Sequence, residues 1–200
     1  MSLFDSSEII KLPLLDAEID YYPGFLGLET SITLFKELEI NTPWKEDDIR
    51  VYGKVFKQPR LTAFFANNEK SYGYSNISMI PHKFTPILNS LKQKIETATK
   101  TTFTSCLLNL YRDGQDSNGW HADDEKELGI NPVIASVSLG AERIFHLKHK
   151  NNKAIKHKLI LQNGSLLMMK GATQHHWLHQ IPKTKKPIGK RINLTFRFLK

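Results

Sequence analysis

The chain has 200 residues, 40% hydrophobic and 24% charged, so it can bury one core and is too apolar for a disordered tail. Lys and Arg number 28 against 20 Asp and Glu, and the resulting formal charge of +8 favours polyanionic partners. No apolar run approaches the ~18 residues of a membrane helix, and the single cysteine, Cys106, excludes an internal disulfide, so we expect a soluble, intracellular protein with Cys106 in its core.

The positive charge is concentrated in the C-terminal part of the chain. Residues 1–49 hold 3 basic and 11 acidic side chains, whereas residues 143–200 hold 14 basic and no acidic ones. A solvated surface is the ordinary explanation of such a stretch. The alternative is a positive field over one side of the domain, for which a phosphate backbone is the commonest ligand.

The first hundred residues predict two helices and a hairpin. Apolar residues recur at near-helical spacing in residues 29–39 and 85–99, and the second helix has Thr85 as N-cap and Pro86 in its first turn. Between the two helices, residues 50–56 predict a β-hairpin with Gly53 in its turn.

The last hundred residues predict β-strands, because short β-branched or apolar runs are separated by Gly, Asn and Pro. The predicted strands are residues 103–111, 133–139, 143–149, 157–162, 165–169, 174–181 and 191–199. Six or seven strands of this kind favour a sandwich or a jelly roll. Since no repeat or low-complexity linker interrupts the sequence, we expect residues 1–200 to form a single domain of the α+β, mainly β, class.

His121 and Asp123 predict part of a metal site. In an extended segment, residues two apart point to the same side, so an imidazole and a carboxylate can face one ion. A jelly roll brings distant strands side by side, so a later histidine can supply the third ligand, and we choose His179, 56 residues beyond Asp123. Two histidines and one carboxylate are typical of non-haem Fe(II) oxygenases, and zinc is the rival metal.

The final predicted strand has a polar and an apolar face. The polar face carries Arg191, Asn193, Thr195 and Arg197, and the apolar face carries Ile192, Leu194, Phe196 and Phe198. The polar face either meets water or lines the barrel, where two guanidiniums need an anion. A dicarboxylate with one end on the arginines and the other on the metal suits that second case. Asn109 and Tyr111 alternate inward on an earlier strand and add an amide and a hydroxyl.

At these positions the sequence resembles the AlkB-type Fe(II)- and 2-oxoglutarate-dependent dioxygenases, which repair alkylated bases. The matching segments are spread, in order, over about half the chain: 109–114 (NLYRDG), 121–125 (HADDE), 134–140 (IASVSLG), 164–169 (GSLLMM), 176–179 (HWLH) and 191–197 (RINLTFR). The resemblance implies a double-stranded β-helix (jelly roll) in residues 101–200, preceded by N-terminal helices and a nucleotide-recognition lid at about residues 50–80. It also implies O₂ as co-substrate, Fe(II) on His121, Asp123 and His179, and 2-oxoglutarate on Asn109, Tyr111, Arg191, Asn193, Thr195 and Arg197.

The same resemblance implies the reaction and the residues that contact the base. N1-methyladenine or N3-methylcytosine in DNA, and also in RNA, would lose its methyl group as formaldehyde, with succinate and CO₂ as coproducts. Residues 72–75 (YGYS) resemble the segment that lines the base pocket, with Tyr72 and Tyr74 on the base and Ser75 supporting them; exposed loop tyrosines are the alternative. Glu125 would accept a hydrogen bond from an exocyclic amine, or else lie in solvent.

Two further segments resemble parts of the family that handle the extruded base. Residues 51–53 (VYG) resemble the hairpin finger that fills the gap in the stack, with Tyr52 as the wedge where the family usually has Phe. Residues 59–65 (PRLTAFF) are also AlkB-like, and Arg60 is expected to touch phosphate or the extrusion site.

Two other functions fit the residues less well. The first is an Fe(II)/2-oxoglutarate hydroxylase or demethylase of RNA or protein, but the aromatic segment 72–75 and the basic C-terminal part weigh against protein. The second is a non-catalytic nucleic-acid-binding module with a structural metal, which leaves Arg191 and Arg197 unexplained. We expect a monomer that binds methylated DNA or RNA, in the cytoplasm of a bacterium or the nucleus of a eukaryote.

Overall fold

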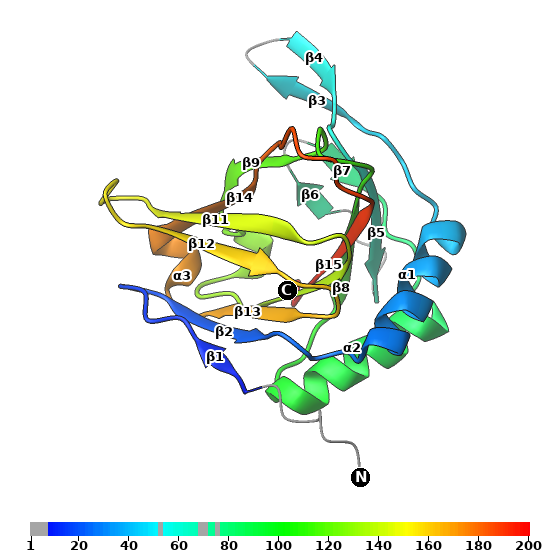
Figure 1. Cartoon of the computed structure of the whole chain (residues 1–200), viewed down its shortest axis with the longest axis horizontal. Helices are drawn as coiled ribbons and strands as arrows, with labels where there is room; N and C mark the ends of the chain where they lie inside the picture. Colours follow the sequence, from blue (N-terminus) through cyan, green and yellow to red (C-terminus); the bar gives the residue numbers. More distant parts are fainter. Residues whose placement is uncertain (1–7, 52–53, 68–71, 75–76) are drawn as a thin grey trace.

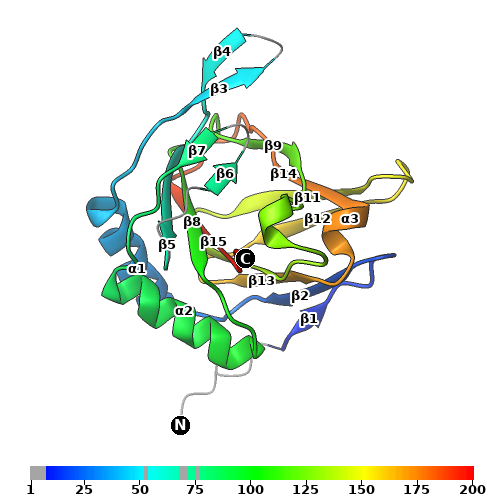
Figure 2. The same ribbon diagram turned by 180° about the vertical axis from the view of Figure 1, so that it is seen from behind.

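The structure is a computed structural model, and it describes residues 8–51, 54–67, 72–74 and 77–200. Within these ranges two antiparallel β-sheets face each other, and two helices lie side by side against the outer face of the larger sheet (Figures 1 and 2). The arrangement confirms the predicted jelly roll and its α+β, mainly β, class. No helix of the described residues is long and apolar enough to cross a membrane.

The larger sheet combines strands from both halves of the chain. Its described strands, in spatial order, are β1 (Ile10–Lys11), β2 (Glu18–Tyr22), β13 (Leu166–Lys170), β10 (Ile134–Gly140), β15 (Arg191–Arg197), β8 (Ser105–Tyr111) and β5 (Leu61–Ala66). β2 pairs with β13, and β5 pairs with β8. The first hundred residues therefore extend the sheet that we expected from residues 101–200 alone.

The smaller sheet and the remaining elements complete the fold. The smaller sheet has the order β12 (Lys156–Leu161), β11 (Arg143–His149), β14 (Trp177–Ile181) and β9 (Asn118–His121). The two hairpins are β3 (Asp48–Val51) with β4 (Lys54–Lys57), and β6 (Tyr72–Tyr74) with β7 (Ile77–Met79). The helices are α1 (Leu28–Asn41), α2 (Pro86–Thr99), the 3₁₀ turn η1 (Lys126–Leu128) and α3 (Thr173–His176). The β3–β4 hairpin projects from the body of the molecule (Figure 1).

Most elements predicted from the sequence are confirmed. α1 and α2 cover the two predicted helices, and the Thr85 hydroxyl accepts a hydrogen bond from the Leu88 N–H at 3.3 Å as the N-cap of α2. All but one of the predicted strands agree with the structure within two residues at each end. The predicted hairpin is formed by β3 and β4, whereas Tyr52 and Gly53 lie outside the described residues.

Two predictions about the last strands are wrong in part. The strand expected at residues 174–181 begins only at Trp177, because the His175 and His176 N–H groups donate to the Ala172 carbonyl oxygen and close the helical turn α3. Phe198 does not share the apolar face of the final strand, since β15 ends at Arg197 and Phe198 is 47% exposed.

The alternation of residues in β8 and β15 divides the core into two layers. On the outer side, Ile192, Leu194 and Phe196 pack with apolar residues of α1 and α2, and Cys106 is fully buried in this layer as predicted. On the inner side, the other residues of both strands face the smaller sheet. The polar face of β15 is therefore enclosed between the two sheets and does not meet bulk water.

Gly140, at the end of β10, has a backbone φ of +83°, and a Cβ at this position would lie 2.5 Å from the Lys190 carbonyl oxygen. We expect Gly140→Ala to lower the free energy of unfolding by about 2–3 kcal/mol, because the left-handed backbone and the overlap with a backbone atom both oppose the methyl group. Gly189→Ala is the matched control, since its Cβ would meet only Ala141 Cβ at 4.0 Å. Urea unfolding followed by circular dichroism measures both changes, and equal midpoints would contradict the expectation.

Candidate active site

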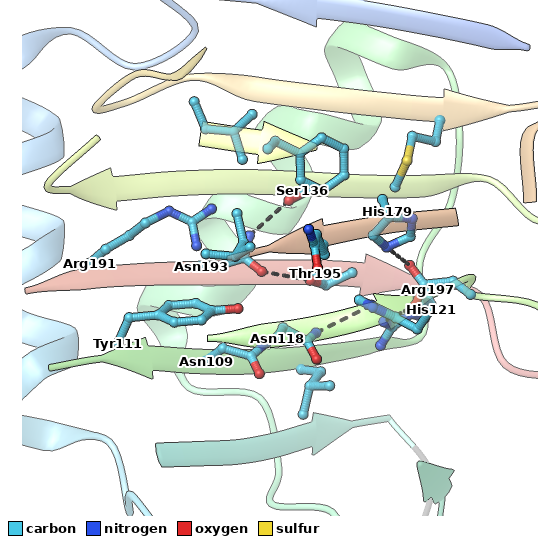
Figure 3. A pocket seen from close by; sticks show the side chains of 17 residues that line it. Asn109, Tyr111, Asn118, His121, Ser136, His179, Arg191, Asn193, Thr195 and Arg197 are labelled. Atoms are coloured by element: carbon cyan, nitrogen blue, oxygen red, sulfur yellow. Dashed lines mark hydrogen bonds and ion pairs between the residues drawn. The ribbon is translucent and has the colours of Figure 1, made fainter. Parts of the chain in front are cut away.

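His121, Asp123 and His179, the three predicted metal ligands, lie together at one end of a pocket between the two sheets. Their ligand atoms all lie within 4.8 Å of one another. His179 on β14 is paired with His121 on the neighbouring strand β9, and His179 Nε2 lies 3.8 Å from Asp123 Oδ2 (Figure 3). The reason for the convergence differs from the one predicted, because β9 ends at His121 and Asp123 lies in the loop that follows.

Two buried side chains fix the orientation of Asp123. Arg197 Nη2 donates to Asp123 Oδ1 at 2.6 Å, and the Asp123 N–H donates to Gln174 Oε1 at 2.9 Å. Burial raises the pKa of Asp123, but the Arg197 guanidinium and the two imidazoles outweigh it, so that the pKa falls to about 2. The carboxylate is therefore anionic near neutral pH, and its Oδ2 faces His179.

The two histidines are neutral and suitably oriented for a metal ion. His121 Nδ1 lies 2.8 Å from the Gly119 carbonyl oxygen, so the ring proton belongs on Nδ1 and the lone pair on Nε2. The Asn118 amide nitrogen lies 3.3 Å from that Nε2 atom. Burial lowers the pKa of His121 and lowers that of His179 to about 3. Two neutral imidazoles and one carboxylate form the facial triad that suits non-haem Fe(II).

Asp16, His149 and His176 form a second group in the described residues, whose ligand atoms also lie within 4.8 Å of one another. The proton positions on His149, however, do not suit a metal ion. His149 Nδ1 accepts from the Asn151 and Asn152 N–H groups at 3.3 and 3.1 Å. The ring proton of neutral His149 is therefore on Nε2, which lies 3.3 Å from Asp16 Oδ2. A metal on Nε2 would displace the last ring proton, so hydrogen bonding favours His121, Asp123 and His179 as the metal site.

Arg191 occupies the same pocket and has an unsatisfied charge. It is 1% exposed, its Nη2 donates to the Ser138 hydroxyl at 2.9 Å, and its Nε and Nη1 have no hydrogen-bond partner in the described part of the chain. Burial lowers the pKa of Arg191 to about 10, although Tyr111 acts in the opposite direction. A buried guanidinium with two free donors needs an anion, and a carboxylate fits its fork.

Asn193 and Thr195 line the pocket, and hydrogen bonds fix their side chains in its wall. Asn193 Nδ2 donates to the Ser136 hydroxyl at 2.8 Å and to the Val137 carbonyl oxygen at 3.1 Å. The Thr195 hydroxyl donates to Asn193 Oδ1 at 3.1 Å (Figure 3). The polar face of β15 therefore forms a connected surface, with Arg191 at one end and Arg197 beside Asp123 at the other.

Asn109 and Tyr111 of β8 form the neighbouring wall of this pocket, as predicted from the alternation. The centre of the Tyr111 ring lies 5.2 Å from Arg191 Cζ. Asn109 Oδ1 accepts a hydrogen bond from Arg60 Nε at 2.8 Å, which leaves the amide nitrogen of Asn109 as the group available to a ligand.

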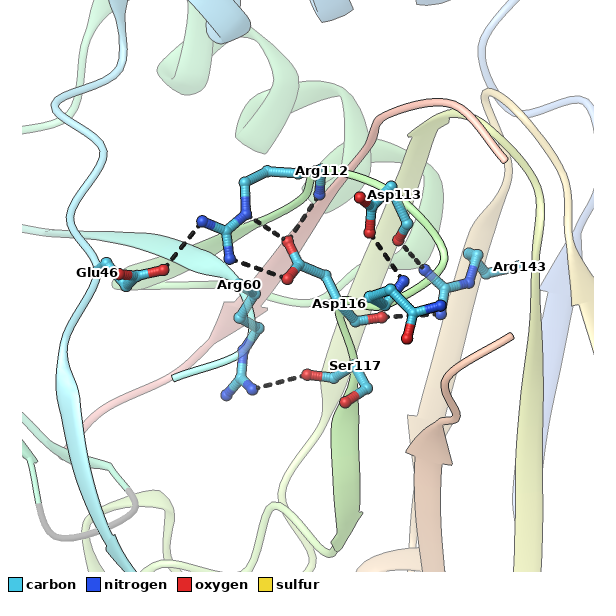
Figure 4. A network of polar contacts seen from close by, with 8 residues as sticks. Glu46, Arg60, Arg112, Asp113, Asp116, Ser117 and Arg143 are labelled. Carbon is cyan, nitrogen blue, oxygen red and sulfur yellow. Dashed lines mark hydrogen bonds and ion pairs between the residues drawn. The ribbon is translucent and has the colours of Figure 1, made fainter. Parts of the chain in front are cut away.

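The contact predicted for Arg60, with phosphate or the extrusion site, stays a prediction, and the structure gives the surroundings of its side chain. Its side chain is buried, with the residue 4% exposed, and its Nη1 donates to the Ser117 carbonyl oxygen at 3.1 Å (Figure 4). Arg60 therefore joins the start of β5 to Asn109 and to the residue before β9. The AlkB-like motif correctly marked this position as special, but the motif alone carries no information on burial.

The structure describes Glu125 in full and the backbone of two other predicted contact residues. Glu125 is half-buried and is the N-cap residue of η1, two residues beyond Asp123. Tyr72 and Tyr74 lie in β6, and the structure describes their backbone only. Tyr52 and Ser75 lie outside the described residues.

Three pocket or ligand contacts were missed from the sequence. Ser136 and Ser138 support Asn193 and Arg191, and their alternation on β10 is a signal that points to the same inner face. Gln174 holds the Asp123 backbone from α3, across 51 residues of sequence, and no local pattern predicts such a contact.

Comparisons with known proteins agree with this site. The family model of the 2OG-Fe(II) oxygenase superfamily matches residues 18–197. Proteins named alpha-ketoglutarate-dependent dioxygenase alkB homolog 3 from Mus musculus and Homo sapiens are 40% and 39% identical over 199 residues, covering 95% of this chain and 69% of theirs. DNA oxidative demethylase ALKBH2 from Bos taurus is 36% identical over 187 residues, 88% of this chain and 67% of its own. The solved structure of OsALKBH1 supports the fold alone, with a TM-score of 0.68 at 16% identity over 96% of this chain and 100% of that chain.

A pair of matched substitutions tests which His/Asp group binds metal, since His121 and His176 are both half-buried. We expect His121→Ala to weaken the binding of Co(II), a spectroscopic substitute for Fe(II), by more than about 100-fold, because it removes a ligand atom. His176→Ala should leave the affinity within about twofold. Anaerobic calorimetry together with the Co(II) absorption spectrum measures both, and a comparable loss in the two variants would contradict the assignment.

Proposed function

Because the chain belongs to the AlkB-type dioxygenases of the 2OG-Fe(II) oxygenase superfamily, which use Fe(II), 2-oxoglutarate and O₂, we propose that it oxidatively demethylates N1-methyladenine and N3-methylcytosine in DNA, and also in RNA. One observation carries the proposal. The half-buried His121 and the buried Asp123 and His179 share a pocket with Arg191, whose two free donors suit the far end of a dicarboxylate. A module with a purely structural metal has no use for such an anion site.

The residues divide into a metal end and an anion end. His121, Asp123 and His179 would hold Fe(II). Arg191 would bind the distal carboxylate of 2-oxoglutarate, with the Tyr111 hydroxyl and the Asn109 amide beside it. Asn193, Thr195 and Arg197 would form the wall between the two ends, and Arg197 would also keep Asp123 in its anionic, oriented form.

With Fe(II), 2-oxoglutarate and O₂ bound, this chemistry oxidises an N-methyl group, which leaves as formaldehyde, and converts 2-oxoglutarate to succinate and CO₂. No side chain has to act as a nucleophile. The contribution of the chain is to orient the bound groups and to exclude water, and the apolar residues of the pocket, Leu107, Phe145, Leu161, Met169 and Ile181, serve the second task.

The nucleic-acid substrate is supported by the relatives and by the charge distribution. One relative is named a DNA oxidative demethylase. The basic stretch of residues 143–200 includes the exposed Lys156 and Lys158 of β12, which suit a phosphate backbone. A damaged base must leave its stack to reach a buried metal, and methylation of the pairing edge lowers that energy. In this proposal Tyr72, Tyr74 and Ser75 line the base pocket, and Glu125 accepts a hydrogen bond from the exocyclic amine.

Formaldehyde release tests the substrate. Purified protein with Fe(II), 2-oxoglutarate and O₂ should release one formaldehyde per succinate from oligonucleotides with N1-methyladenine or N3-methylcytosine. Asp123→Asn should abolish release and keep oligonucleotide affinity within about twofold, because the amide still accepts from Arg197 while the anionic metal ligand is lost. If 2-oxoglutarate binds but formaldehyde comes only from methylated RNA or from a methylated peptide, the DNA assignment is wrong.

Tyr52 provides a separate test of how the base is reached. If Tyr52 fills the gap in a duplex, Tyr52→Ala should slow duplex repair about tenfold more than single-strand repair, since a tenfold change is ~1.4 kcal/mol out of the few kcal/mol that extrusion costs. Tyr52→Phe should restore the ratio, because it keeps the aromatic ring. Equal losses on both substrates in single-turnover assays would argue against a wedge.

A further inference from the structure

Arg143, the first residue of β11, is a buried cation that the proposed mechanism does not use. It is 3% exposed. Its Nη1 donates to the Asp113 carbonyl oxygen at 3.1 Å, and its Nη2 donates to the Asp116 carbonyl oxygen at 2.9 Å (Figure 4). Nη2 also donates to the Pro182 carbonyl oxygen at 2.6 Å. One guanidinium therefore joins the loop that precedes β9 to the loop that follows β14.

Arg143 also lies against the aromatic ring of Tyr111. Arg143 Cζ is 5.6 Å from the centre of that ring, and Arg191 Cζ is 5.2 Å from it. Two guanidiniums at these distances are attracted to the same π-system. Tyr111 is 2% exposed and is paired with Arg191 across β8 and β15, so its hydroxyl reaches the pocket from a position that Arg143 helps to define.

The two arginines create an excess of positive charge at this end of the pocket. In the described part of the chain, both guanidiniums donate to neutral acceptors, which are backbone carbonyls for Arg143 and the Ser138 hydroxyl for Arg191. Burial lowers the pKa of Arg143, and the Asp116 and Asp113 carboxylates oppose this without outweighing it. The charge of Arg143 also contributes to lowering the pKa of Arg191. An anionic group bound at this end of the pocket would relieve the repulsion between Arg143 and Arg191.

We propose that Arg143 is a positioning residue for 2-oxoglutarate, which fixes Tyr111 and adds a second positive charge at the end of the pocket where the distal carboxylate binds. The inference rests on the proposed function, which places that carboxylate at Arg191. Arg143 does not touch the co-substrate. It acts through its contact with the Tyr111 ring and through its positive charge, which adds to that of Arg191. It should therefore favour 2-oxoglutarate over 2-oxopentanoate, which has the same chelating end but no distal carboxylate.

Binding of 2-oxoglutarate to the Mn(II)-loaded protein, measured by calorimetry without O₂, tests the role directly. We expect Arg143→Met to weaken binding about tenfold, the size typical of a residue that orients a ligating group, and to leave the affinity for 2-oxopentanoate within about twofold. In the Tyr111→Phe background, Arg143→Met should cost less than about threefold, because the hydroxyl that it positions is already absent and only its charge still acts. An equal loss in both backgrounds, or an equal loss for both oxo acids, would overturn the proposal.

Turnover provides an independent readout. Arg143→Met should raise the KM for 2-oxoglutarate about tenfold and change the KM for the methylated oligonucleotide and the kcat at saturating 2-oxoglutarate by less than about twofold. A general loss of folding would instead lower the apparent kcat and leave both KM values unchanged, because it reduces only the concentration of active enzyme. Arg143→Lys serves if the Met variant does not fold: it keeps the charge but loses the three-carbonyl fork, so a threefold or larger loss of 2-oxoglutarate affinity is expected, and wild-type affinity would overturn the role.

Two further variants separate this inference from the function on which it rests. Arg112→Met removes a guanidinium of the loop between β8 and β9 that binds Asp116 and Glu46, and it should leave 2-oxoglutarate affinity within about twofold. Arg191→Met should lose most of that affinity. Normal binding by Arg191→Met would refute the placement of the distal carboxylate, whereas a loss in Arg191→Met with none in Arg143→Met would refute only the role of Arg143.

Discussion

The buried ion pair between Arg197 and Asp123 is the contact on which the site depends. Arg197 ends β15 of the larger sheet, and Asp123 lies in the loop that follows β9 of the smaller sheet, so their 2.6 Å contact joins the two sheets at the metal end of the pocket. Either charge alone would be costly to bury. The pair keeps Asp123 anionic, directs one carboxylate oxygen toward His179, and ties the position of the metal group to the strand that carries the anion site.

Much of the fold and of the candidate site could be predicted because both follow a period of two residues. The alternation of β15 separates Ile192 and Leu194, which pack under the helices, from Arg191 and Asn193, which face the pocket. The same alternation on β8 correctly placed Asn109 and Tyr111. Where periodicity was weak, prediction failed. β5 is a nearly continuous apolar run and β9 is only Asn118–His121, so neither has a clear strand pattern.

Side chains that act across long sequence separations could not be predicted in this way. Gln174 reaches the Asp123 backbone, and Arg60 reaches Asn109, only because the two sheets and the connecting loops have packed. The burial of Arg60 shows the limit of a motif, which marks a position without giving its surroundings. Distances alone do not identify a metal site either. Asp16, His149 and His176 lie close enough to bind a metal, but His149 Nδ1 already accepts hydrogen bonds from two backbone N–H groups.

The unsatisfied guanidinium of Arg191 has a consequence for the stability of the folded protein. Without an anion, the folded state bears the electrostatic cost of a buried cation that the unfolded chain does not bear. A ligand that binds only the folded state stabilises it in proportion to the logarithm of its concentration. In the proposed function that ligand is 2-oxoglutarate, so its concentration would set the fraction of protein that is folded as well as the rate of turnover.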